Sequence, residues 1–185
     1  MRNTAAILGI GNILWADEGF GVRAVEALNA RYCTKDDVQI IDGGTQGLSL
    51  LPIVEDAEFL LIFDAIDFGL PCGTMKTVFD EDVPRYLTAK KLSLHQTSFQ
   101  DVLALAQLSG RLPPRMVLIG VQPLDLNTYG GNLTAPVAAQ ISPAVKLALC
   151  CLEDANVKFI PRLESDEIEP LGPLAVSELT YEFDV

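Results

Sequence analysis

Blocks of apolar residues alternate with mixed polar stretches along this chain, and the spacing predicts strands and helices in turn. Apolar runs at residues 5–10, 59–64 and 115–121 predict strands, and the run at 59–64 is typical of a central strand that is covered on both faces. Less apolar runs at residues 38–42 and 74–79 predict two further strands, of which the second is more peripheral. The pattern therefore favours a sheet with a buried centre.

Helical spacing predicts helices over residues 19–31, 48–54, 97–108 and 134–156. Ser98 and Asp101 form a capping box that opens the third of these helices, and Pro143 is expected to bend the fourth. Alternation of strands with helices predicts one three-layer α/β domain, with a largely parallel twisted sheet and helices on both faces.

The domain is expected to span residues 1–158, and residues 159–185 form an acidic extension that we expect to be mostly irregular. The 185 residues carry 13 basic and 25 acidic side chains, a net charge of −12, so a nucleic-acid partner is excluded by repulsion. Seven acids and one base follow residue 159, which places about half of this excess in the extension.

No apolar run is long enough for membrane insertion and no secretory signal is evident, so we expect a cytoplasmic protein.

The first strand ends in Gly9-Ile10-Gly11, which invites a comparison with dinucleotide-binding loops. That fingerprint requires a third glycine, and Leu14 occupies its position. A nucleotide-dependent oxidoreductase is therefore a minor alternative. The four cysteines lack a C-x-x-C spacing and are typical of free thiols in a reducing compartment.

Three side chains follow strands or precede helices and are candidates for chemistry. Glu18 stands at the entrance to the first helix after Asp17, which we expect to be the N-cap; Asp64 ends the central strand; and His95, the only histidine, is predicted in a loop before the third helix. Each also has a structural interpretation: Glu18 as a first-turn carboxylate, Asp64 as a backbone cap, and His95 as a loop residue bonded to backbone.

The carboxyl ends of parallel strands share one edge of a sheet, so these three side chains are expected to converge if their strands are neighbours. Two carboxylates and an imidazole suit a borderline divalent cation such as zinc or nickel, with coordination positions left open. The spacing along the sequence alone does not establish that convergence.

The chain resembles the nickel–iron hydrogenase maturation endopeptidases, most closely those that serve membrane-bound uptake hydrogenases. The resemblance runs from about residue 6 to residue 131 and rests on LGIGNILWADEGFGVR, IDGGTQGLSLL, LLIFDAIDFGLPCGT, AKKLSLHQTSFQDVLALA and LIGVQP followed by YGG. It implies an endopeptidase that removes the C-terminal extension of the hydrogenase large-subunit precursor after nickel insertion.

The resemblance assigns the metal contacts to Glu18, Asp64 and His95, and the catalytic candidates to Asp42, Asp64 and His95. The nickel is implied to arrive in the precursor, with another divalent cation possible in its absence. Hydrolysis is implied to be metal-assisted or of the aspartic type; because metal-bound carboxylates are poor bases, Asp42 is the residue to test as general base. The main alternative is a non-catalytic nickel-site chaperone of the same precursor.

Overall fold

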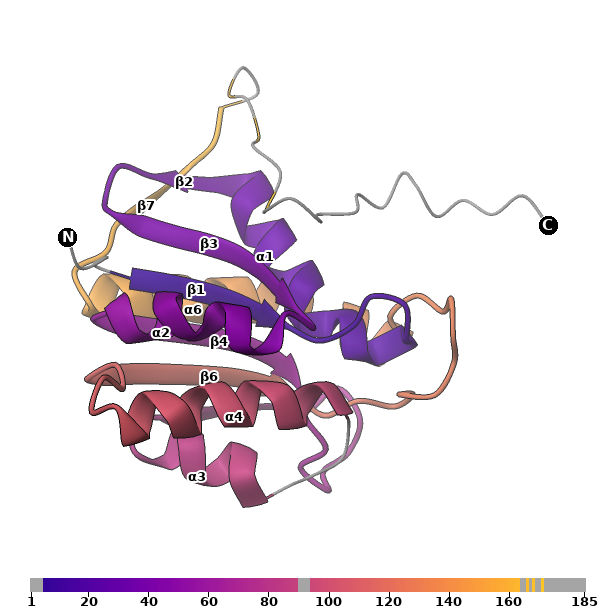
Figure 1. Ribbon diagram of the computed structural model, residues 1–185. Helices are drawn as coiled ribbons and strands as arrows, with labels where there is room; N and C mark the ends of the chain where they lie inside the picture. Colours follow the sequence, from indigo (N-terminus) through magenta and orange to yellow (C-terminus); the bar gives the residue numbers. More distant parts are fainter. Residues whose placement is uncertain (1–4, 90–93, 164–165, 167, 169–170, 172–185) are drawn as a thin grey trace.

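The computed structural model describes residues 5–89, 94–163, 166, 168 and 171, without the side chains of residues 88–89 and 94–98. Its main sheet has five strands in the order β3-β1-β4-β6-β5 (Figure 1). β5 pairs antiparallel to β6 at one edge, and the other pairs are parallel. The strands are β1 (Ala5–Ile10), β3 (Val38–Gly44), β4 (Phe59–Ala65), β5 (Met75–Phe79) and β6 (Arg115–Val121). The predicted α/β fold is confirmed.

Helices cover both faces of this sheet, each over its own apolar cluster (Figure 1). Ile7 and Leu61 face the cluster that contains α1 (Phe20–Arg31), α5 (Ala135–Ala138) and α6 (Ile141–Asp154). Their neighbours Leu8 and Ile62 face the opposite cluster, because successive side chains of a strand alternate. The second cluster is covered by η2 (Gly47–Leu50), α2 (Leu51–Asp56), α3 (Asp82–Ala89) and α4 (Leu94–Leu108).

A small second sheet joins the start of the expected C-terminal extension to the domain. β2 (Tyr32–Thr34) pairs antiparallel with β7 (Phe159–Pro161), and neither strand is predicted by the apolar pattern. The Arg162 guanidinium then donates to the backbone carbonyl and the side-chain oxygen of Asn29. Leu171 lies buried in the α1–α6 cluster. Most of the remaining extension lies outside the described residues.

Two helix boundaries differ from the prediction. α4 begins at Leu94, so Ser98 lies inside the helix and is not its cap, and His95 lies in the first turn and not in a loop. The predicted helix over residues 134–156 is two helices that break after Ala138. Pro143 lies in the first turn of α6, where its missing N–H costs no helical hydrogen bond, so it does not bend the helix.

The segment Ala135–Asp154 is long and apolar enough to cross a membrane by length and composition. Val145, Ala148 and Leu152 on this segment are buried against the sheet and α1 in the first core cluster. A core helix passes the same test of length and composition, and α6, which makes up most of this segment, packs into the core of the domain.

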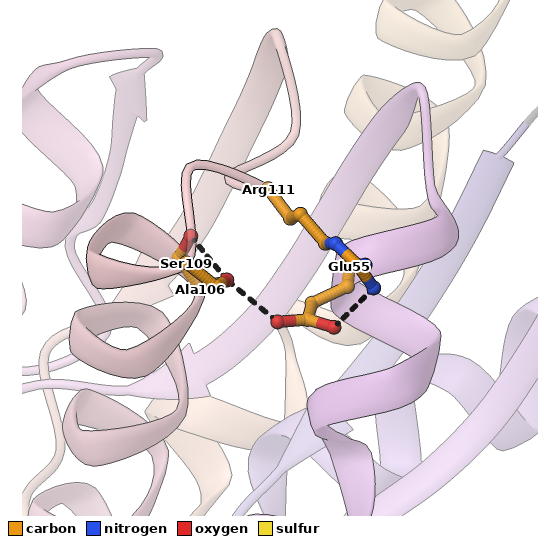
Figure 2. A network of polar contacts seen from close by, with 4 residues as sticks. All are labelled: Glu55, Ala106, Ser109 and Arg111. Atoms are coloured by element: carbon orange, nitrogen blue, oxygen red, sulfur yellow. Dashed lines mark hydrogen bonds and ion pairs between the residues drawn. The ribbon is translucent and has the colours of Figure 1, made fainter.

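A polar contact at the end of α4 fixes that helix against α2. Glu55 on α2 accepts hydrogen bonds from the Ser109 hydroxyl (2.7 Å) and from the Arg111 guanidinium (3.2 Å), and the Ser109 hydroxyl also lies 3.0 Å from the Ala106 carbonyl (Figure 2). Because β6 begins soon after α4 ends, the end of α4 lies at the amino edge of β6. The beginning of α4 therefore lies toward the carboxyl edge of the parallel strands (Figure 1).

Candidate active site

The carboxyl ends of β1 and β4 are the place where a ligand of this sheet is expected to bind. The chain leaves β1 into α1 on one face, and it leaves β4 toward α3 and α4 on the other face. Neighbouring strands whose connections diverge in this way leave a crevice between them, where ligands of open α/β sheets bind. Glu18 follows β1 and Asp64 lies within β4, so both acids belong to this crevice.

Two glycines allow the chain to pack closely around Glu18. Gly11, at a φ of 132°, brings its α-carbon so near the Glu18 carbonyl that a β-carbon would lie 1.8 Å from that oxygen. Gly21 places the start of α1 directly on β1 and β4, and a β-carbon there would lie 2.2 Å from the Ile10 carbonyl and 2.3 Å from that of Phe63. Glu18 is thereby held close to the strand ends, and its Oε2 atom is buried.

Asp64 is a buried carboxyl that interacts with Glu18. Its exposed fraction is 3%, and burial raises its pKa well above the ordinary value. The hydrogen bond with the Ala65 backbone opposes this rise, and the charge of Glu18 adds to it by repulsion. The two acids that the sequence predicts to converge are therefore near neighbours in the fold.

Asp42 lies near the end of β3, apart from this pair. Its neighbour Ile41 packs on the α2–α4 face, so alternation turns Asp42 toward the α1 face, whereas Asp64 by the same rule lies on the α2–α4 face. Burial raises the pKa of Asp42 to about 6; Glu26 adds to the rise, while the Gly44 backbone and Arg23 oppose it. β1 separates β3 from β4, so Asp42 stands two strand spacings, about 10 Å, from Asp64.

The side chain of His95 lies outside the described side chains, so its convergence with Glu18 and Asp64 stays a prediction. Its place in the first turn of α4 puts its backbone on the α2–α4 face, toward the carboxyl edge at which Asp64 lies. Among the described residues, no group of three histidine, cysteine, aspartate or glutamate side chains is arranged to hold a metal ion. A site that uses Glu18 and Asp64 therefore needs a ligand from His95 or from the substrate.

Asp17 has a role that differs from the predicted one. It is not an N-cap: Trp15 precedes η1 (Ala16–Gly19), and no side chain caps that turn. Asp17 is fully buried, and its carboxylate binds the loop after β6, more than 100 residues away.

Sequence reasoning also missed Gln122, whose side chain accepts hydrogen bonds from the Phe68 and Leu70 backbones and so orders the loop after β4.

Comparison with known proteins assigns this chain to one family. The sequence model described as "Hydrogenase maturation protease" matches residues 22–150. The chain belongs to the hydrogenase maturation protease family.

Curated relatives and solved structures agree with this assignment. The hydrogenase expression/formation protein HupD of Bradyrhizobium diazoefficiens is 54% identical over 183 residues, which cover 99% of this chain and 91% of that protein. The hydrogenase 2 maturation protease of Escherichia coli is 44% identical over 158 residues, 84% of this chain and 94% of its own length. The structure of the hydrogenase maturating endopeptidase HybD from E. coli superposes with a TM-score of 0.81 at 42% identity, covering 86% of this chain and 98% of that one.

Proposed function

We propose that this chain is the endopeptidase that removes the C-terminal extension of a nickel–iron hydrogenase large-subunit precursor after nickel insertion, and that it acts in the cytoplasm. The nickel already seated in the precursor is the feature that the enzyme recognises. The observation that carries this proposal is the pair of neighbouring acids, Glu18 and Asp64, in the crevice of a hydrogenase maturation protease.

The charge state of the pair suits a cation that arrives with the substrate. Because burial and the charge of Glu18 raise the pKa of Asp64, its carboxyl group favours the protonated form until a cation binds. A divalent cation compensates both carboxylates and displaces that proton. Glu18, Asp64 and His95 are then the side chains that contact the nickel, and the same contacts hold the nearby scissile bond in place.

Asp42 is the proposed general base. A carboxylate that binds a metal ion is a poor base, so Glu18 and Asp64 are unsuited to this task once nickel is bound. The pKa of Asp42, about 6, leaves most of its carboxyl groups ionised at neutral pH yet able to take up a proton.

Mass spectrometry of the large subunit tests this proposal against the alternative of a nickel-site chaperone. The purified chain is incubated with nickel-loaded precursor, and the mass of the large subunit is followed over time. We expect a shortened large subunit together with a released C-terminal peptide. A stable complex in which the large subunit keeps its full length would identify a chaperone and refute the protease.

A further inference from the structure

Asp17, the acid beside Glu18, is fully buried and takes part in no step of the proposed reaction. Its carboxylate accepts four hydrogen bonds, all from the loop that follows β6. Oδ2 accepts from the Leu124 backbone (2.8 Å), the Asp125 backbone (2.9 Å) and the Thr134 hydroxyl (2.9 Å), and Oδ1 accepts from the Thr134 backbone (2.7 Å). A carboxylate, which can accept at both of its oxygens, matches this set of donors.

Further contacts fasten the same two segments to each other. The Asp17 backbone donates to the Asp125 carbonyl (3.0 Å), and the Gly130 backbone donates to the Leu14 carbonyl (2.8 Å). Trp15 forms an isolated bridge with Tyr129, and their rings meet edge to face at 5.3 Å. The short turn that carries Glu18 has no side-chain cap of its own. The contacts with the loop after β6 therefore help to set the position of this turn.

We propose that Asp17 is a positioning residue, which holds the η1 turn so that Glu18 faces Asp64. This inference rests on the proposed function, because it assigns Asp17 a part in presenting Glu18 to the nickel. The action is geometric: Glu18 is the acid whose charge raises the pKa of Asp64, and Asp17 is not among the causes of that rise. Without the carboxylate at position 17, Glu18 keeps its chemistry but loses its fixed place beside Asp64.

Asp17→Asn is the variant that tests this role, because its amide presents an NH₂ group to backbone donors at nearly unchanged volume. We expect kcat/KM for nickel-loaded precursor to fall at least 10-fold, at a temperature where circular dichroism shows the variant folded. Thr134→Val, which removes one of the four donors, is expected to lose about 2- to 5-fold. Asp80→Asn is the matched control: Asp80 accepts from the Met116 backbone (2.9 Å) at the opposite edge of the sheet, and the variant is expected to stay within 2-fold of wild type.

A double-mutant cycle with Glu18→Gln separates positioning from a merely structural role. If Asp17 acts through Glu18, adding Asp17→Asn to the Glu18→Gln variant lowers the rate less than 2-fold. If instead the double variant loses the product of the two single losses, the residues act independently and the proposal is overturned. Where cleavage by Glu18→Gln is too slow to measure, the cycle is measured as the affinity for nickel-loaded precursor. The double variant and Glu18→Gln should then bind the precursor with the same affinity. If Asp17→Asn does not fold, the same cycle is measured with Thr134→Val in its place.

The two proposals fail in different ways. A wild-type protein that leaves nickel-loaded precursor at full length refutes the proposed function. A wild-type protein that cleaves it, together with an Asp17→Asn variant that is equally fast or whose loss is independent of Glu18, refutes only the role of Asp17.

Discussion

Replacing Asp42 with asparagine is expected to stabilise the fold while it disables the reaction. Burial and Glu26 raise the pKa of Asp42 from 3.8 to about 6. The folded state therefore keeps a proton that the unfolded state releases, and the wild type loses folding free energy as the pH rises through this range. The difference between the two pKa values corresponds to at most about 3 kcal/mol. Because solvent reaches part of the side chain, we expect about half of this, about 1.5 kcal/mol.

The pH dependence of this gain is the specific signature. An asparagine amide does not titrate. The free energy of unfolding of Asp42→Asn should therefore exceed that of the wild type by about 1.5 kcal/mol at pH 7.5 and by about half of that at pH 5. Urea unfolding measures both values, with fluorescence of the single tryptophan, Trp15, and circular dichroism as independent probes. A variant that is less stable than the wild type at pH 7.5, or a gain that is equal at both pH values, would refute the reasoning about burial.

The same variant tests the proposed general base. Removal of a general base lowers the rate by about 100-fold or more, so Asp42→Asn should cleave nickel-loaded precursor at least about 100-fold more slowly despite its greater stability. The rate is measured by mass spectrometry under single-turnover conditions. A rate within about 3-fold of wild type would remove Asp42 from the reaction and favour hydrolysis assisted by the metal alone.

His95→Ala is expected to abolish processing of nickel-loaded precursor with an unchanged circular dichroism spectrum; processing at the normal rate would exclude His95 from the site. Asp64→Asn is expected to need more urea for unfolding than wild type at pH 7.5, because it removes a buried carboxyl that Glu18 repels, and this gain should shrink toward pH 5. An equal gain at both pH values would contradict it. Glu55→Gln weakens the contact of Figure 2 and should cost about 1 kcal/mol of unfolding free energy, while processing continues at the wild-type rate; slower processing by folded protein would show that the contact reaches the site.

The fold could be predicted from sequence wherever one local signal dominated. The run at residues 115–121 is apolar after Arg115 and forms β6 with the same bounds. The sequence pattern does not predict β2 and β7, because each has only three residues. Each forms a strand by pairing with the other, which lies more than 100 residues away in the sequence. The start of α4 was misplaced because Ser98 and Asp101 imitate a capping box, whereas the helix begins a turn earlier.

The candidate site was predictable only in part, for a related reason. The position of Asp64 near a strand end makes it a candidate site residue, and the structure adds that Glu18 raises its pKa. The face on which Asp42 lies depends on the register of β3, which sequence spacing does not give. The role of Asp17 depends on donors at Leu124 and Thr134, which only the folded chain brings to it.

Comparison of nickel-loaded with nickel-free precursor is the most direct test of the central claim, that this protease reads the metal in its substrate. Both forms are offered to the wild-type protein at equal concentration, and cleavage is followed by the mass of the large subunit. We predict cleavage of the nickel-loaded form and a large subunit that stays at full length in the nickel-free form. Equal rates of cleavage for the two forms would contradict the account.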